Sequence, residues 1–235
     1  MKILSFIFKI SDTKELVNAL EIDLSASSCT AIMGPVGSGK SLLIKLLSDS
    51  QLREVNAFTE YPFCAYLSQD LTRLFTGNSP STIIELYKDK RYTVGQHFAP
   101  TLFDQYAKKL EIDQLLAKNR RLAHYSEGER QRLGLCLAAA VKAPVTILDE
   151  PTTALNMAYR QIMYDMIEEI RKRSRVFIIS HRLLDCIAVA DHVIRMENLN
   201  IAEHFPIEQI IEKDHILNYY SFENEVRNVR RSNKR

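Results

Sequence analysis

The fold is decided by the stretch Gly34-Pro35-Val36-Gly37-Ser38-Gly39-Lys40-Ser41. A short apolar run, residues 29–33, comes directly before it, and leucines on one helical face, from Leu42 to Leu47, follow it. An apolar run of this length predicts a buried strand, and the leucine spacing predicts a helix. The sequence therefore predicts a strand, a glycine-rich turn and a helix in direct succession.

The glycine-rich stretch matches the pattern G-x-x-x-x-G-K-[ST], in which each residue type suits the binding of phosphate. Glycines let backbone N–H groups turn inward around an anion with no Cβ in the way. The helix that follows directs its positive end at the same anion. Lys40 adds a point charge for the phosphates, and Ser41 adds a hydroxyl that can hold Mg²⁺.

Two adjacent carboxylates, Asp149 and Glu150, end a second apolar run at 145–148. In parallel sheets, ligands bind at the carboxyl ends of the strands. Asp149 would hold Mg²⁺ there, directly or through water, and Glu150 could accept a proton from an attacking water. Alone, the pair could be an acidic turn before Pro151, and the phosphate loop alone would also fit kinases and GTPases.

Apolar runs alternate with helical patterns along the chain. The predicted strands are 2–10, 20–24, 29–33, 63–67, 145–148 and 176–179. Helical patterns at 126–141 and 157–172 lie before and after the fifth of these strands. Such alternation predicts an α/β fold with a mainly parallel sheet covered by helices on both faces. Residues 78–140, which contain Pro80 and Pro100, interrupt the alternation and are predicted to form an inserted helical subdomain.

Composition limits the classes of function. The 235 residues, 46% of them hydrophobic, are enough for one large domain with a core. The net charge of +2 gives no overall attraction to nucleic acid or acidic lipid. Cys29, Cys64, Cys136 and Cys186 are too far apart for a zinc site and indicate reduced, buried thiols of a cytoplasmic protein. The apolar run at 133–141 is far shorter than the roughly 20 residues of a membrane span, so a membrane role would require a separate membrane subunit.

A third motif reads Tyr125-Ser126-Glu127-Gly128-Glu129-Arg130-Gln131-Arg132. It resembles the signature of the ATP-binding cassette (ABC) family, usually written L-S-G-G-Q. Gln69 resembles the family's Q-loop glutamine, Asn156 ends a segment similar to its D-loop, and His181 resembles its switch histidine. Ser126 and Glu129 also have the spacing of a helix capping box, and both interpretations can hold together.

The resemblance implies an ABC-type P-loop NTPase domain over 1–205, with the helical subdomain at 78–140 and a partly helical, basic tail at 206–235. It implies a homodimer or heterodimer that holds two ATP molecules and Mg²⁺ between head-to-tail subunits. The implied catalytic residues are Glu150, His181 and Lys40. The implied metal residues are Ser41, Gln69 and Asp149. The implied nucleotide-binding residues are Gly34, Pro35, Val36, Gly37, Ser38, Gly39, Lys40, Ser41, Leu42, Gln69, Ser126 and Gly128.

The resemblance further implies ATP hydrolysis that powers integral membrane transporter subunits from the inner face of the cell membrane, with no nucleic-acid partner. Residues 69–75 resemble the Q-loop region of energy-coupling-factor importers. Residues 120–124 lack the acidic-glycine segment that many exporters carry, so import is favoured. A soluble ABC ATPase acting on nucleic acid, ribosomes or cofactor assembly is the alternative. It is less favoured because the sequence contains one cassette and no long coiled-coil insertion.

Several residues depart from the family pattern. Glu127 and Glu129 replace a glycine and a glutamine of the signature, which adds negative charge near a phosphate. Asn156 replaces an aspartate, and Leu42 replaces a threonine beside the α-phosphate. Ser11 stands where an aromatic ring usually stacks on adenine. These departures leave a third hypothesis open, a regulatory cassette of low activity.

Overall fold

The computed structural model describes residues 6–11, 14–18, 28–48, 63–68, 78–118 and 120–212. The strand predicted at 20–24, Gln69 and most of the predicted tail lie outside these ranges. The chain divides into two compact units: the first comprises Met1–Glu60 and Phe177–Arg235, and the second comprises Tyr61–Val176. The division falls inside strand β6 (Arg175–Ile179).

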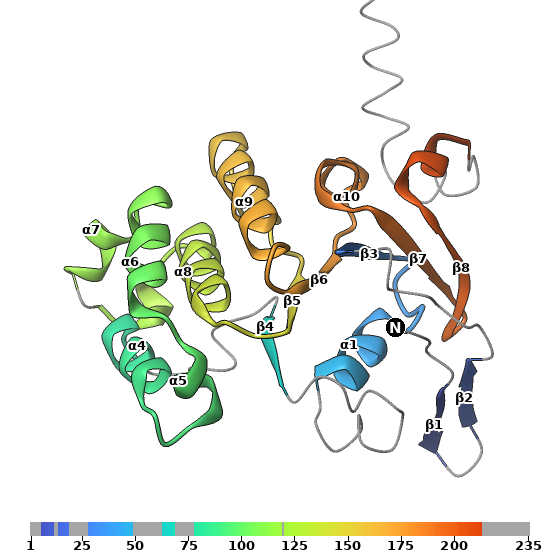
Figure 1. The fold of residues 1–235 in the computed structure, drawn as a ribbon, viewed down its shortest axis with the longest axis horizontal. Helices are drawn as coiled ribbons and strands as arrows, with labels where there is room; N and C mark the ends of the chain where they lie inside the picture. Colours follow the sequence, from blue (N-terminus) through green and yellow to red (C-terminus); the bar gives the residue numbers. More distant parts are fainter. Residues whose placement is uncertain are drawn as a thin grey trace, which may run out of the picture. The chain divides into compact units, whose positions relative to one another are not determined.

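The first unit is built on the strand order β6-β3-β7-β8. Strand β3 (Cys29–Met33) pairs in parallel with β7 (His192–Glu197), and β7 pairs in antiparallel with β8 (Asn200–Pro206). Helices α1 (Lys40–Ser48) and α10 (Leu183–Val189) lie on opposite sides of β3 and β7 (Figure 1). The remaining elements are a hairpin of β1 (Phe6–Ser11) and β2 (Lys14–Asn18) and the 3-10 helix η2 (Ile207–Glu212).

Strand β3 lies in the core of the first unit, since all five of its residues are buried. A strand covered on both faces needs apolar residues throughout, which is why its sequence does not alternate. Its start is fixed by the Asp191 carboxylate, which accepts hydrogen bonds from the Ser28 N–H at 2.9 Å, the Ser28 hydroxyl at 3.0 Å and the Cys29 N–H at 3.0 Å. Because Asp191 directly precedes β7, its carboxylate joins the starts of two neighbouring parallel strands.

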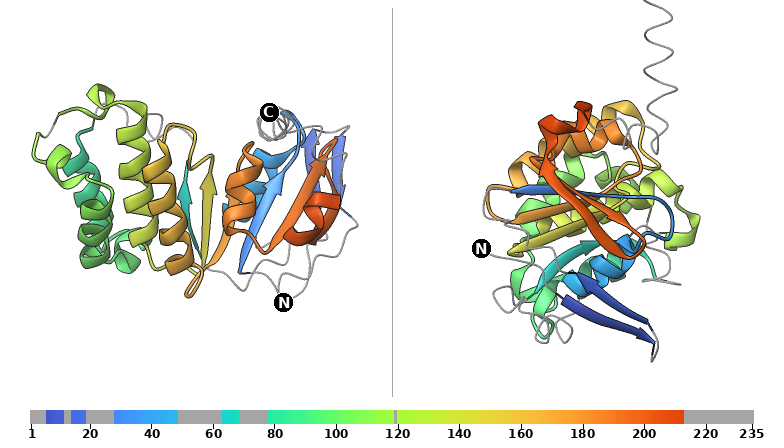
Figure 2. Two further views of the ribbon diagram at one scale, coloured as in Figure 1. Left: turned by 90° about the horizontal axis from the view of Figure 1, so that it is seen from above. Right: turned by 90° about the vertical axis from the view of Figure 1, so that its right-hand side faces the viewer.

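The second unit combines two parallel strands, β4 (Cys64–Leu67) and β5 (Val145–Asp149), with a group of helices. The helices are α4 (Pro80–Lys88), α5 (Thr93–His97), α6 (Pro100–Lys109), α7 (Asp113–Leu116), the 3-10 helix η1 (Leu122–His124), α8 (Glu127–Ala140) and α9 (Met157–Ile170). Helices α6, α8 and α9 run side by side (Figure 2). Every residue of α8 from Leu133 to Ala140 is buried, so α8 is the central helix of this unit.

The prediction of an α/β fold with a mainly parallel sheet is confirmed. The domain limits 1–205, 78–140 and 206–235 stay predictions. No prediction covered α10, β7 and β8. The β7–β8 turn lacks the Asn-Gly pair that marks a hairpin, because Asn198 is followed by Leu199, and both adopt positive φ, 48° and 66°.

Two further sequence expectations concern the membrane and the cysteines. Within the part of the chain that the structure describes, no helix combines the length and the apolar character that crossing a bilayer requires. The four cysteines all lie in described residues and form no disulfide. Three of them are buried as expected, whereas Cys64 on β4 is half-buried.

Candidate functional site

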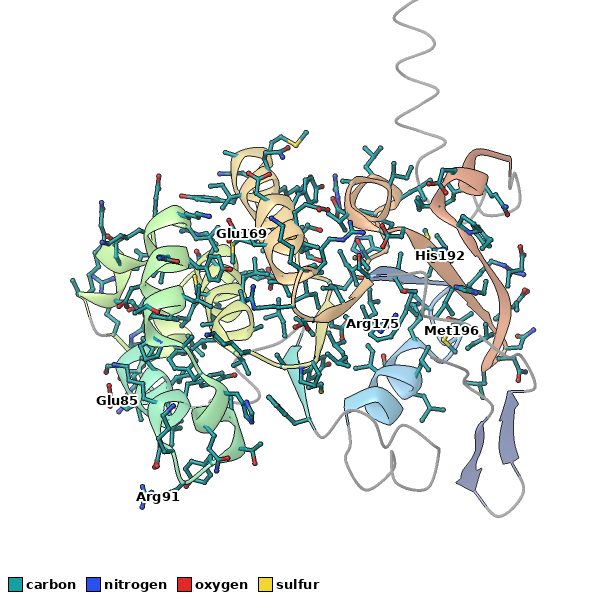
Figure 3. The ribbon with its side chains drawn as sticks, in the orientation of Figure 1. Glu85, Arg91, Glu169, Arg175, His192 and Met196 are labelled. Atoms are coloured by element: carbon teal, nitrogen blue, oxygen red, sulfur yellow. The ribbon has the colours of Figure 1, made fainter. Side chains whose placement is uncertain are left out.

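The loop at 34–41 joins β3 to α1 as the sequence predicts. Three of its residues adopt positive φ: Gly34 at 149°, Gly37 at 80° and Gly39 at 102°. Glycine enters this region at little cost, whereas other residues are strained there. Gly34 is also enclosed, because a Cβ on it would lie closer than 3.0 Å both to the carbonyl oxygen of Met196 and to the Ser38 Oγ. Met196, labelled in Figure 3, belongs to β7. The backbone of this loop therefore depends on its glycines.

The Lys40 ammonium is held by the loop itself. It donates hydrogen bonds to the carbonyl oxygens of Gly34 at 2.7 Å and Pro35 at 2.9 Å. Val36, at the tip of the loop, is fully exposed, and Ser41 is exposed at the start of α1. A positive charge thus lies against a loop whose tip faces solvent.

Ser38 is the most informative residue of the loop. Its side chain is 3% exposed, and its Oγ has no hydrogen-bond partner among the described residues. Its carbonyl oxygen accepts a hydrogen bond from the Leu199 N–H at 3.0 Å, so the β7–β8 turn supports the loop. A buried hydroxyl without a partner costs about 1–3 kcal/mol. A phosphate oxygen would supply that partner, and the loop therefore fits a phosphate ligand.

In the second unit, β5 ends at Asp149 as predicted. The Tyr66 hydroxyl, from β4, donates a hydrogen bond to Asp149 Oδ2 at 3.2 Å. Burial, followed by the negative charge of Asp149, raises the pKa of Tyr66 to about 12. The sequence interpretation missed Tyr66, although β4 was predicted. Only the pairing register, with Tyr66 opposite Ile147, reveals that Tyr66 and Asp149 lie on one face of the strands.

Glu150 has an unusual backbone for a glutamate. It is 8% exposed and adopts a φ of 50°, a conformation that costs a non-glycine residue about 1–3 kcal/mol. Its carbonyl oxygen accepts a hydrogen bond from the buried Gln131 Nε2 at 2.9 Å, and its Oε2 accepts one from the Thr153 hydroxyl at 3.4 Å. Gln131 on α8 thus holds the strained backbone of Glu150 in place, a role that the sequence did not reveal.

The motif at 125–132 begins helix α8 with a complete capping box. The Ser126 N–H donates to Glu129 Oε2 at 2.6 Å, and the Glu129 N–H donates to Ser126 Oγ at 3.3 Å. The backbone hydrogen bond from Ser126 holds the pKa of Glu129 below its usual value. Gly128 has a packing reason to be glycine, because its Cβ would lie 2.7 Å from the Ala154 carbonyl oxygen. The capping box and the close packing of Gly128 are structural reasons for this sequence, and the nucleotide-binding role of Ser126 and Gly128 stays a prediction.

Replacing Glu129 with glutamine should lower the free energy of unfolding at pH 7 by about 0.5–1.5 kcal/mol more than the same change at Glu127, because only the Glu129 carboxylate accepts a charge-assisted hydrogen bond from the Ser126 N–H, which a neutral amide accepts more weakly. Because the folded pKa of Glu129 is depressed, its contribution is present above the unfolded pKa of about 4.3 and is lost as the pH falls through the lower folded pKa. Urea unfolding of both proteins across this pH range measures the difference. Glu127→Gln is the control, since Glu127 lies in the same helical turn and is exposed; an equal loss in both variants would refute the specific role of Glu129.

The predicted D-loop residue Asn156 begins helix α9. Its Oδ1 accepts a hydrogen bond from the Tyr159 N–H at 3.0 Å. Asparagine and aspartate cap helices about equally well. The departure from the family pattern at this position therefore removes a charge and keeps the cap.

His181 lies two residues after the end of β6, following the strand as the sequence predicts. It is exposed and belongs to the first unit. Both of its neighbours are anchored to the buried carboxylate of Asp185. The Ser180 hydroxyl donates to Asp185 Oδ2 at 3.3 Å, and Arg182 forms an ion pair with the same oxygen at 3.3 Å. The Arg182 N–H also donates to the Ser180 Oγ at 3.0 Å. The segment that carries His181 is thus fixed on both sides.

The predicted site residues fall into two groups. Residues 34–42 and His181 belong to the first unit, whereas Ser126, Gly128, Asp149 and Glu150 belong to the second. Gln69 lies outside the described residues.

Among the residues that the structure describes, no group of three or more His, Cys, Asp or Glu side chains could hold a metal ion. Mg²⁺ needs no such group, because one or two protein oxygens and the phosphates of a substrate suffice.

A buried strand, a loop with positive-φ glycines and a helix that begins at a lysine define a P-loop nucleoside triphosphatase. The chain belongs to the ABC transporter family, whose model matches residues 17–153, more than half of the chain. The prediction of an ABC-type ATP hydrolase is thereby confirmed.

Named relatives cover most of the chain. It is 27% identical to the hemin import ATP-binding protein HmuV of Shewanella denitrificans, over 86% of this chain and 85% of that protein. It is 27% identical to the thiamine import ATP-binding protein ThiQ of Vibrio vulnificus, over 83% and 87%. It is 26% identical to the β-(1→2)glucan export ATP-binding/permease protein NdvA of Bartonella quintana, over 88% of this chain and 37% of that protein.

Solved structures share the fold. An ATP-binding subunit of an ABC transporter superposes with a TM-score of 0.66 at 15% identity, covering 92% of this chain and 93% of that chain. A bacterial Atm1-family ABC exporter with ATP bound superposes with a TM-score of 0.69 at 19% identity, and this chain spans 40% of its length. At these identities, the likeness concerns the fold alone.

Proposed function

We propose that this chain is the ATP-hydrolysing subunit of a membrane transporter and that it powers import. The observation that best supports a nucleotide site is the buried Ser38 hydroxyl. It has no hydrogen-bond partner among the described residues and lies inside a loop of positive-φ glycines. Membership of the ABC transporter family supports the link to transport.

The loop at 34–41 would bind the ATP phosphates through its backbone N–H groups and the Ser38 hydroxyl. Lys40 would leave the carbonyl oxygens of Gly34 and Pro35, which it contacts in the structure, and pair with the phosphates. Ser41 and Asp149 offer the oxygen ligands that Mg²⁺ prefers, and Gln69 is the third proposed metal residue. When bound, Mg²⁺ stabilises negative charge on the phosphate oxygens.

Hydrolysis would depend on groups that act on water and on the γ-phosphate. Glu150 would accept a proton from the attacking water, and His181 would donate a hydrogen bond to the γ-phosphate. Ser126 and Gly128 would contribute from the opposing subunit of a homodimer or heterodimer. Phosphoryl transfer depends mainly on positioning and charge stabilisation. The anchors of His181 and of the Glu150 backbone suit this requirement.

The proposed partners are integral membrane transporter subunits, with this chain bound peripherally at the inner face of the cell membrane. Import is supported by the names of the hemin and thiamine relatives, each matched over most of its length. The resemblance of residues 69–75 to energy-coupling-factor importers agrees with it, although these residues lie outside the described ranges.

A copurification experiment tests the proposal. The tagged chain, extracted from the membranes of its own cells in mild detergent, should be recovered in stoichiometric amounts with a protein that has several membrane spans. In proteoliposomes, ATP supplied on the side of the cassette should drive solute toward that side. The Lys40→Ala variant should keep the membrane partner and lose ATP-driven transport. Recovery with ribosomes or nucleic acid in place of a membrane protein would overturn the proposal.

One observation favours the regulatory cassette as a second candidate. Ser126 already uses its N–H and its Oγ in the capping box with Glu129. A second subunit's γ-phosphate would meet this carboxylate at the start of α8. An ATPase rate near zero for the reconstituted complex, together with intact nucleotide binding, would support the regulatory cassette.

A further inference from the structure

Strands β4 and β5 bring a tyrosine hydroxyl to the carboxylate at the end of β5. They pair in parallel with Tyr66 opposite Ile147, and Asp149 lies two residues beyond Ile147. Because side chains alternate between faces with a period of two, all three residues share one face. The tyrosine is long enough to reach diagonally, and its hydroxyl donates to Asp149 Oδ2 at 3.2 Å.

The direction of this hydrogen bond follows from the chemistry of the two groups. An ionised carboxylate can only accept hydrogen bonds, so the Tyr66 hydroxyl is the donor. The Ser68 side chain also forms a hydrogen bond with Tyr66. Tyr66 therefore connects Asp149 to the residue that directly precedes Gln69.

We propose that Tyr66 is a positioning residue for the metal: its hydroxyl holds the Asp149 carboxylate in the orientation that receives Mg²⁺ or a Mg²⁺-bound water. This inference rests on the proposed function, in which Asp149 serves the metal. Groups that hydrogen-bond to the ligands of a metal orient them. Loss of such a group typically costs 10–100-fold in metal affinity or activity.

Tyr66→Phe removes the hydroxyl and keeps the ring. With the full chain and excess non-hydrolysable ATP analogue, the Mn²⁺ concentration at half-saturation, read by electron paramagnetic resonance, should rise about 10-fold. The Mg²⁺ concentration for half-maximal ATPase activity should rise by a similar factor. Binding of the analogue in EDTA should be unchanged, because the phosphate loop is intact.

Tyr159→Phe is the matched control. The Tyr159 hydroxyl also donates to a carboxylate, Glu111 Oε2, at 2.7 Å. Its loss should leave the metal requirement at the wild-type value. An equal rise in both phenylalanine variants would mean that the Tyr66 effect is a general loss of a tyrosine–carboxylate hydrogen bond, and it would overturn the inference.

Asp149→Asn separates this inference from the proposed function. If Asp149→Asn raises the metal requirement and Tyr66→Phe does not, the positioning role is wrong and the proposed role of Asp149 stands. If Asp149→Asn leaves the requirement unchanged, the proposed role of Asp149 itself is wrong. The double variant should bind metal no more weakly than Asp149→Asn alone; fully additive losses would overturn the positioning role.

Discussion

Glu150→Gln is expected to reduce ATP hydrolysis by about 10²–10⁴-fold, the usual contribution of a general base, while ATP binding is retained. The amide has the shape of the carboxylate and cannot accept the proton of the attacking water. The contact with Gln131 uses the Glu150 backbone, so the substitution leaves it in place. Single-turnover hydrolysis measures the loss, and size-exclusion chromatography with ATP should show a trapped dimer.

The chain provides a matched control for this experiment. Glu111 is a second glutamate with positive φ, 53°, and its carboxylate likewise accepts a hydrogen bond from a hydroxyl group. Glu111→Gln should hydrolyse ATP at the wild-type rate. This comparison separates the loss of the proton acceptor from the effect of an amide at a position with a strained backbone. A wild-type rate in Glu150→Gln would exclude Glu150 as the base.

Gly34→Ala is expected to lower the free energy of unfolding by about 3 kcal/mol, of which about 1–2 kcal/mol is the cost of positive φ and the rest overpacking. The new Cβ would meet the Met196 carbonyl oxygen, a backbone atom of β7 that has little freedom to move. The loop would shift, and the affinity for a fluorescent ATP analogue should fall more than 10-fold. Urea unfolding and equilibrium titration measure the two losses.

Gly37→Ala is the comparison for Gly34→Ala. Gly37 also has a positive φ, 80°, and a Cβ on it would meet nothing within 4 Å. Its alanine variant should therefore lose only the conformational part, about 1–2 kcal/mol. Equal destabilisation of the two variants would show that the close approach of Met196 has no energetic consequence.

Local signals explain what the sequence could predict. The phosphate loop could be predicted from the glycine and lysine spacing within eight neighbouring residues. The start of α8 could be predicted from a capping box of four residues. Apolar runs were sufficient to predict β3 and β5, because strands buried on both faces are apolar throughout. In α9, which lies within the predicted helix 157–172, the buried residues Met163, Met166, Ile167 and Ile170 have the spacing of one helical face.

Contacts between distant segments explain what the sequence could not predict. Tyr66 meets Asp149 only through the register of β4 and β5, and Gln131 meets the Glu150 carbonyl oxygen only through the packing of α8. The β7–β8 turn forms at Asn198 and Leu199, which lack the Asn-Gly pair typical of such turns, and its Leu199 N–H donates a hydrogen bond to the Ser38 carbonyl oxygen. None of these contacts can be predicted from hydrophobic periodicity.

Helix α8 has one further consequence for a dimer of such chains. Its first residues would face the neighbour's nucleotide, while Gln131, within the next turn and a half, grips the backbone of the chain's own Glu150. In the proposed dimer, a tilt of α8 caused by the neighbour's ATP would therefore also move the backbone of Glu150, the proposed base. The buried amide of Gln131 would then couple nucleotide binding at one site to the position of Glu150 at the other.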